Sequence, residues 1–204
     1  MHINKLNKYD VFIFDCDGVI LDSNEIKSLA FADVVKEYGY EAVKNFVNYH
    51  KKNGGVSRHE KFSYFITNIL EIEFDEKLYG KFLDSYQRIT LESLINAQVI
   101  PGTLELLNYI QSTKKVFVVS GGLESDLQII FNHKGLTKYF NQILGSPKSK
   151  IDNIKKLIRS KQIPEKNAKV IFFGDSYSDL EAAKEFGYDF IYISKYSEIA
   201  NKNI

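Results

Sequence analysis

The sequence predicts an α/β protein with a Rossmann-like parallel sheet and a helical domain inserted after the first strand. Short runs of aliphatic and aromatic residues alternate with stretches of helical periodicity, an order typical of parallel α/β sheets. The runs are continuously apolar, as expected of strands that are covered on both faces. About a hundred residues after the first run contain no convincing strand, which predicts the inserted helical domain.

The predicted strands are short, and their aliphatic and aromatic content favours strands over helices. The first is the run VFIFD at residues 11–15. The other well-marked runs are residues 115–120, 169–175 and 190–194. A weaker fifth candidate lies at residues 139–146.

Helical patterns separate these runs, as a parallel sheet requires. The candidate helices that follow the insertion are residues 102–113, 124–135, 150–160 and 178–187. In the first of them, Leu104, Leu107 and Ile110 form one apolar stripe. Gly135 and Gly187 close two others, in the position where glycine often terminates a helix.

The insertion contains amphipathic helical patterns at residues 24–39, 57–71 and 76–95. We expect the core to comprise residues 1–20 and 98–204 and the helical domain to comprise residues 21–97. The segment 96–102, with its proline and glycine, is the expected return hinge. The aromatic residues of these helices are interpreted as packing residues of the helical domain.

The composition excludes several classes of protein. The 204-residue chain has a formal net charge of +1, so its overall charge attracts neither nucleic acid nor a membrane surface. Cys16 is the only cysteine, which excludes an intramolecular disulfide and a cysteine-based metal cluster. The sequence lacks an apolar run of membrane-spanning length and a signal-peptide pattern. We therefore expect a cytoplasmic protein with a small-molecule partner, and neither a nucleic acid nor a membrane partner.

Polar residues stand where three of the predicted strands end. They are Asp15 and Asp17 on the first, Ser120, Gly121 and Gly122 on the second, and Asp175 after the run at 169–175, with Asp179 four residues later. Ligands of parallel α/β sheets bind beyond the carboxyl ends of the strands, so these groups are expected to meet at one rim.

The acids at this rim favour a hard divalent cation, because carboxylates without a counter-charge are costly in a mostly apolar setting. Oxygen-only ligands suit Mg²⁺ better than Zn²⁺. Ser120 and the glycines after it offer a hydroxyl and backbone N–H groups to a phosphate oxygen. Lys148 and Lys150 lie before a predicted helix, where a lysine offsets the charge of acids and phosphate. This set predicts phosphoryl transfer through an aspartyl-phosphate, with one aspartate as nucleophile and the other as acid and base.

At this point the sequence resembles the haloacid dehalogenase superfamily, in its phosphatase branch with a helical cap domain inserted after the first strand. The motif DxDGV matches residues 15–19, and the motif GDSxxD matches residues 174–179. The Ser or Thr of the second family motif matches Ser120, and the lysine of the third matches Lys150 or Lys148. The resemblance covers essentially the whole chain, and the pair of aspartate motifs is highly specific.

The resemblance implies a role for each acid. Asp15 is then the nucleophile and a Mg²⁺ ligand, and Asp17 is the general acid/base that binds the metal through its backbone carbonyl. Asp175 is a further metal ligand, and Asp179 supports the metal directly or through water.

The resemblance also implies the phosphate-binding groups. Ser120 and the Gly121 N–H would hold the phosphoryl group, with a lysine beside them. We prefer Lys150 for this lysine, because the Pro-x-Pro that follows the lysine in the subset matching Lys148 is absent.

The leading function is thus a Mg²⁺-dependent phosphatase acting on a small phosphate monoester such as a sugar phosphate. The alternative is a phosphomutase, because residues 54–58, GGVSR, resemble the cap loop of β-phosphoglucomutases. A dehalogenase is disfavoured because those enzymes do not use the acid two residues after the nucleophile. A non-catalytic binding protein is disfavoured because the acid set is intact.

Arg58 is the candidate specificity residue of that loop. It follows Ser57, a good N-cap, and its charge opposes the helix dipole in the first turn. A cation placed there is expected to face an anion, either an acid of the core rim or a second charged group of the substrate; a surface position is equally compatible. Asp22 and Ser23 are interpreted as a helix N-cap at the start of the helical domain rather than as catalytic residues. The four histidines show no metal-ligand spacing.

Overall fold

Five parallel strands form a single sheet in the order β3-β2-β1-β4-β5 in the computed structural model, which describes residues 3–164 and 168–198. The strands are β1 Val11–Phe14, β2 Lys115–Leu123, β3 Gln142–Ser146, β4 Val170–Gly174 and β5 Asp189–Tyr192. Every neighbouring pair is parallel. The predicted α/β fold with a parallel sheet is confirmed.

The central strand β1 shows why continuous apolar runs indicated a sheet covered on both faces. Phe12 and Phe14 point into one apolar cluster, and Val11 and Ile13 point into another. Successive side chains of a strand alternate between the faces of its sheet, so both faces at β1 are buried.

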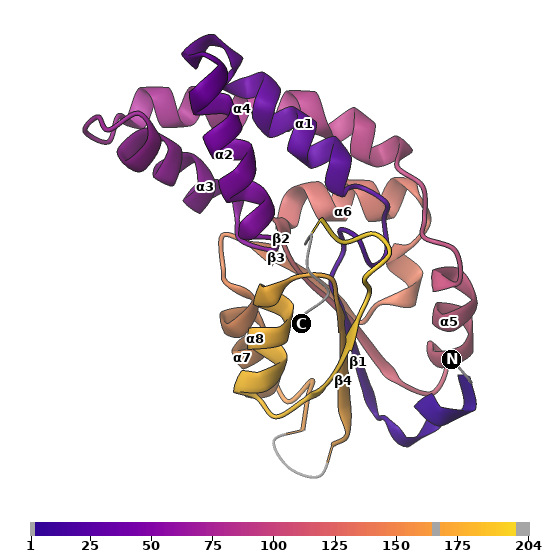
Figure 1. The fold of residues 1–204 in the computed structure, drawn as a ribbon. Coiled ribbons are helices and arrows are strands. Elements are labelled where there is room, and N and C mark those ends of the chain that lie inside the picture. The colour runs from indigo at the N-terminus through magenta and orange to yellow at the C-terminus, as the bar shows by residue number, and fades with distance from the viewer. Residues whose placement is uncertain (1–2, 165–167, 199–204) are drawn as a thin grey trace.

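Two pairs of helices cover the two faces of the sheet (Figure 1) and contribute apolar side chains to these clusters. Helices α5, Thr103–Ile110, and α6, Glu124–His133, pack on the face that carries Phe12. Helices α7, Lys150–Arg159, and α8, Tyr177–Glu185, pack on the opposite face. The four helices predicted after the insertion therefore exist, each within a few residues of its expected range.

Two strand boundaries differ from the prediction by three residues, and the others by at most two. The weak candidate at 139–146 forms a strand only from Gln142, because Thr137–Tyr139 makes a 3-10 turn before it. Strand β2 continues past Ser120 to Leu123, and its pairing with β3 shifts register between Val119 and Leu123. The residues predicted to bind phosphate therefore lie within the irregular end of β2.

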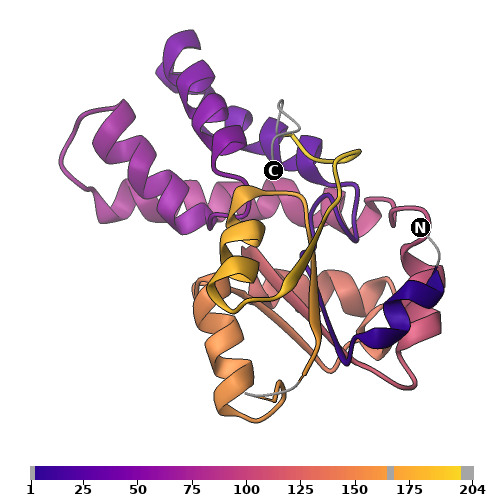
Figure 2. The same cartoon turned by 60° about the horizontal axis from the view of Figure 1, so that its bottom comes forward.

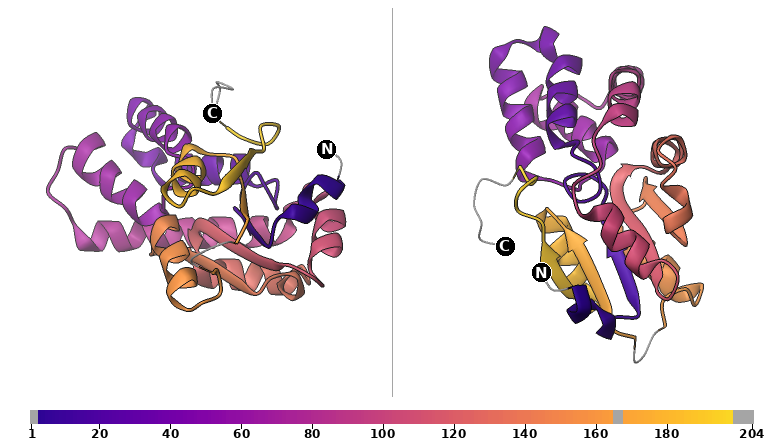
Figure 3. Two further views of the ribbon diagram at one scale, coloured as in Figure 1. Left: turned by 90° about the horizontal axis from the view of Figure 1, so that it is seen from below. Right: turned by 90° about the vertical axis from the view of Figure 1, so that its right-hand side faces the viewer.

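The segment between β1 and β2 is helical, as predicted. It contains α1 Asn24–Val34, α2 Tyr40–Lys52, α3 Arg58–Tyr64 and α4 Glu76–Asn96, with a π-helical turn at Phe65–Ile69 and a 3-10 turn at Lys36–Tyr38. Helix α2 was not predicted, and the pattern at 24–39 is split by the end of α1 at Val34. These helices gather beyond the carboxyl ends of the strands (Figures 2 and 3).

The inserted helices, residues 24–96, enclose an apolar cluster of their own. Phe31, Phe46, Phe62 and Phe82 are at most 2% exposed and contact one another through their rings. The interpretation of these aromatic residues as packing residues is confirmed. Helix α4 has 21 residues, yet neither it nor any other helix within the described ranges is long and apolar enough to cross a membrane.

Candidate active site

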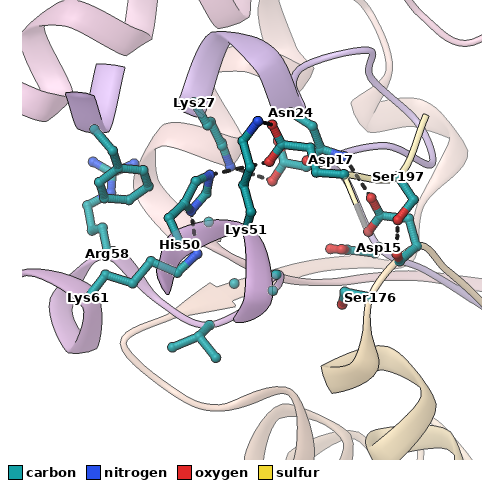
Figure 4. A pocket seen from close by; sticks show the side chains of 18 of the residues that line it. Asp15, Asp17, Asn24, Lys27, His50, Lys51, Arg58, Lys61, Ser176 and Ser197 are labelled. Atoms are coloured by element: carbon teal, nitrogen blue, oxygen red, sulfur yellow. Dashed lines mark hydrogen bonds and ion pairs between the residues drawn. The ribbon is translucent and has the colours of Figure 1, made fainter. Parts of the chain in front are cut away.

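A pocket lies where the carboxyl ends of β1, β2 and β4 face the inserted helices (Figure 4). Its volume is about 50 Å³. The core side presents Asp15, Asp17, Gly121 and Asp175. The opposite wall comes from α1 to α4, the loop before α3 and the segment after β5. The sheet therefore brings the predicted residues from three strand ends to one place.

Lys150 joins two of the predicted acids. It is the first residue of α7, and its Nζ lies 3.0 Å from Asp15 Oδ2 and 2.5 Å from Asp179 Oδ1. All three side chains are almost completely buried. Lys148 is exposed on the loop before the helix. Of the two candidate lysines, the structure brings Lys150 to Asp15.

The crowding of carboxylates changes how two of them ionise. Burial and the nearby charge of Asp179 raise the pKa of Asp15 to about 7, although Lys150 acts in the opposite direction. Burial together with Asp15 and Asp179 raises the pKa of Asp175 to about 8. One oxygen each from Asp15, Asp175 and Asp179 lie within 4.8 Å of one another. Such a group of acids is stabilised by a cation in addition to Lys150.

Asp179 has both oxygens engaged by the protein. It is the third residue of α8, and its Oδ2 accepts hydrogen bonds from Ser176 Oγ at 2.5 Å and from the Ser176 N–H at 3.1 Å. Its Oδ1 accepts the bond from Lys150. Asp179 therefore closes the capping box that starts α8 and at the same time holds the lysine against Asp15.

Asp17 is held from the side of the inserted helices. Its Oδ1 accepts a hydrogen bond from Ser23 Oγ at 2.6 Å, and its Oδ2 contacts Lys27 Nζ. Burial alone would raise the pKa of Asp17, but Lys27 and Ser23 outweigh it and the pKa lies below its usual value. Ser23 occupies the N-cap position of α1, as one of the two residues predicted there, and its hydroxyl donates to Asp17 rather than capping the helix backbone.

The end of β2 approaches the loop before α3 very closely. A Cβ on Gly121 would lie 2.1 Å from the Gly55 carbonyl oxygen, so only glycine fits there. Ser120 is completely buried, and its Oγ accepts a hydrogen bond from the Gly122 N–H, which leaves the hydroxyl hydrogen for another acceptor. Of the predicted phosphate-binding residues, Gly121 and Gly122 line the pocket and Ser120 lies buried beneath it. The Gly54-Gly55 turn covers this end of β2.

Arg58 faces an acid of the core rim, the first of the two alternatives open from the sequence. Its Nη2 lies 2.7 Å from Asp126 Oδ2, and its guanidinium stands 4.8 Å from the centre of the Tyr86 ring. Gln87 donates to the other oxygen of Asp126. Arg58 also lines the pocket, and its contact with substrate stays a prediction.

Several pocket residues were not assigned a role from the sequence. Asn24 donates to Asp175 Oδ2 at 2.7 Å and to the Tyr196 carbonyl at 2.8 Å. Ser197 donates to the Asp175 carbonyl, and Glu198 accepts from Ser28 of α1. The segment after β5 therefore contacts both the core and α1, and the sequence carries no motif that signals this.

His50 and Lys61 meet on the wall formed by the inserted helices. Lys61 Nζ lies 2.8 Å from His50 Nδ1, and both side chains are buried. Burial, with a further contribution from Lys61, lowers the pKa of His50 to about 4. Only the folding of the helices brings these two side chains together, because a lysine and a histidine eleven residues apart show no pattern in the sequence.

Comparison with known proteins adds a family and several relatives. A family model described as haloacid dehalogenase-like hydrolase matches residues 12–193. A phosphorylated carbohydrates phosphatase of Thermotoga maritima is 26% identical over 191 residues, which cover 90% of this chain and 84% of the relative. A phosphoglycolate phosphatase of Aquifex aeolicus is 29% identical over 182 residues, covering 87% and 81%.

Solved structures share the fold. A β-phosphoglucomutase from Clostridium difficile matches with a TM-score of 0.74 and 20% identity, over 90% of this chain and 84% of that one. A predicted phosphatase from Clostridium acetobutylicum matches with a TM-score of 0.72 and 20% identity, over 93% and 86%.

Proposed function

The chain belongs to the haloacid dehalogenase-like hydrolases, and we propose that it is a Mg²⁺-dependent phosphatase that hydrolyses a small phosphate monoester, such as a sugar phosphate, through an aspartyl-phosphate. The observation that carries the proposal is the position of Asp15. It ends the central strand, lies buried in the pocket, and has Lys150 3.0 Å away. The named relatives, which include phosphatases of phosphorylated carbohydrates and of phosphoglycolate, support the same chemistry. The cytoplasmic location stays a prediction.

The two acids of the first motif have different roles in the reaction: Asp15 is the nucleophile, and Asp17 is the general acid and base. A carboxylate oxygen of Asp15 attacks phosphorus, the bond from phosphorus to the ester oxygen breaks, and Asp17 gives a proton to the leaving alcohol. Because the pKa of Asp17 is lowered in the pocket without substrate, this step requires the form of the enzyme in which Asp17 has taken up a proton. In the second step Asp17 takes a proton from water as the water oxygen attacks phosphorus. The bond to Asp15 then breaks and phosphate leaves. The Ser23 and Lys27 contacts orient Asp17 toward the inserted helices, where the leaving group would lie.

The phosphoryl oxygens need donors that are in place before the reaction. Ser120 has its hydroxyl hydrogen available, and the Gly121 backbone stands at the pocket wall without a side chain. Lys150 keeps the nucleophile oriented and offsets the negative charge that accumulates with a bound phosphate.

The residues fit a Mg²⁺ ion, because the group formed by Asp15, Asp175 and Asp179 offers only oxygen ligands, within 4.8 Å. Asp15 and Asp175, together with the Asp17 backbone carbonyl, would hold the ion. Asp179 would support it while keeping its bonds to Ser176 and Lys150. A bound Mg²⁺ neutralises charge on the phosphoryl oxygens and orients them.

The inserted helices would act as the cap of this site, with a domain boundary as expected from the sequence at residues 21 and 97. Their contribution is to exclude water and to select the leaving group. The contact between Gly55 and Gly121 supports this role, because it brings the loop before α3 onto the phosphate-binding end of β2. The closed loop also fits the phosphomutase alternative, because a mutase must transfer its phosphoryl group to a second substrate rather than to water.

The first experiment is hydrolysis of p-nitrophenyl phosphate with and without Mg²⁺, using Asp15→Asn and the exposed control Asp22→Asn. We expect Mg²⁺-dependent turnover that Asp15→Asn lowers by several orders of magnitude, about 10³-fold or more, and that Asp22→Asn leaves unchanged. Activity of Asp15→Asn within tenfold of wild type would refute the assignment of the nucleophile. Turnover that requires a bisphosphate activator and a sugar phosphate would favour the mutase.

A further inference from the structure

The cations that line the pocket differ in whether an acid compensates them. Lys27 pairs with Asp17, Arg58 pairs with Asp126 at 2.7 Å, and Lys51 lies 3.6 Å from Glu198. Lys61 has no carboxylate partner among residues 3–164 and 168–198. Its side chain is nevertheless almost completely buried.

The contacts of Lys61 are unusual for a lysine. Its Nζ lies 2.8 Å from His50 Nδ1 and 5.4 Å from the centre of the Phe31 ring. An ammonium only donates, so His50 accepts through Nδ1 and carries its own proton on Nε2. That Nε2 is buried and makes no hydrogen bond within the described residues; the Glu198 carboxylate, at 3.5 Å, is not in hydrogen-bonding geometry.

His50 and Lys61 together therefore offer more donors than acceptors. Burying an amine without an acid costs free energy, and here burial and the charge of Lys27 lower the pKa of Lys61 to about 7. Packing alone would be served better by an apolar side chain at position 61. The arrangement is explained if an anion occupies the pocket in the working enzyme.

We propose that Lys61 binds a carboxylate on the non-reacting part of the substrate, so that the preferred substrates are small phosphate esters of hydroxy acids. This inference rests on the proposed phosphatase function. Asp15 and Asp17 lie on one side of the pocket and Lys61, Arg58 and His50 on the other, so a molecule with a phosphate at one end and a carboxylate at the other matches both walls (Figure 4).

The charge of Lys61 favours a carboxylate over a second phosphate. One uncompensated ammonium matches the single charge of a carboxylate, whereas a phosphate group carries about 1.5 to 2 negative charges.

The test compares two substrates of nearly equal size, 2-phosphoglycolate and 2-hydroxyethyl phosphate, which differ in whether the tail is a carboxylate or an alcohol. Wild type, Lys61→Met and the matched control Lys51→Met are assayed with Mg²⁺, after circular dichroism has verified their folding. Lys51 also lines the pocket but is half-exposed, so its substitution removes the same charge without removing the buried amine.

We expect wild type to favour 2-phosphoglycolate by about tenfold or more in kcat/KM, and Lys61→Met to lower that ratio roughly 10- to 100-fold, the effect of one charge-assisted hydrogen bond. Lys51→Met should keep the ratio within about threefold of wild type, as expected for an exposed charge. A wild-type ratio near one, a ratio that Lys61→Met leaves unchanged, or an equal fall in both variants overturns the inference while leaving the phosphatase function intact. Absence of hydrolysis of these esters and of p-nitrophenyl phosphate overturns the proposed function and the inference together.

Discussion

Replacing Lys61 by methionine should make the protein more stable near neutral pH, the reverse of most substitutions at buried positions. The wild-type ammonium is buried without an acid, and the pKa of Lys61 is lowered from 10.5 to about 7. A lowered lysine pKa means that the unfolded chain binds its proton more tightly than the folded protein does. The penalty is therefore fully present below pH 7, shrinks as pH rises from 7 to 10.5, and is absent above that range.

The size of the effect follows from that difference in pKa. At about 1.4 kcal/mol for each tenfold change, holding the charged amine in the fold costs roughly 5 kcal/mol of unfolding free energy at pH 6. Methionine removes this cost but also removes the bond to His50, leaving Nδ1 without its donor, a loss of about 2–3 kcal/mol. We expect Lys61→Met to be more stable by about 2 kcal/mol at pH 6 and to lose this advantage by about pH 9.

Urea unfolding followed by far-ultraviolet circular dichroism at pH 6, 7.5 and 9 measures this, since the chain contains no tryptophan to report by fluorescence. Lys51→Met is the control, with an expected change below about 0.5 kcal/mol at every pH. A Lys61→Met protein that is less stable than wild type at pH 6 would show that the amine is compensated in the fold. The reasoning that assigns it to a ligand would then fail.

Three further outcomes are expected. Asp175→Ala should weaken the dependence of activity on Mg²⁺, and excess EDTA should silence the wild-type enzyme; full activity in EDTA would refute a metal site built on the carboxylate group. Arg58→Ala should lower the unfolding free energy by about 3 kcal/mol, because it leaves Asp126 buried without its cation; the double variant with Asp126→Ala should recover part of the loss, and additive losses would contradict this coupling. Gly121→Ala should lower kcat by about tenfold or more and also lower the thermal stability, because its methyl group would displace the Gly55 backbone from the closed pocket; kcat near the wild-type value would show that this contact is dispensable.

The strand ends were predictable from the sequence because their signals are local. Four apolar residues end at Asp15, and the parallel topology then dictates that Asp15 and Asp175 lie at the same rim. Helix α2 was missed although Val43 and Phe46 have helical spacing. Gly39 stands at its N-cap position with a φ of 88° and makes no side-chain cap, so the usual start signal is absent.

Residues on the inserted side of the pocket were harder to predict because tertiary placement determines their role. A lysine in a polar helix is expected in solvent, and the docking of α3 is what buries Lys61. Ser23 has the sequence position of a cap, but Asp17 offers its hydroxyl a closer charged acceptor. The contacts of Ser197 join segments far apart in the chain, and no periodicity encodes them.

The central place of β1 in the sheet has a consequence for how the chain folds during synthesis. β1 leaves the ribosome first, yet both strands that pair with it, β2 and β4, begin about a hundred or more residues later. At roughly 5–20 residues per second, this apolar segment waits about 5–20 s for its first partner. The inserted helices have their own aromatic cluster, so they can fold during that interval while both edges of β1 stay unpaired. Substitutions that delay the pairing of β2 are expected to lengthen this exposure and so to lower the yield of folded protein.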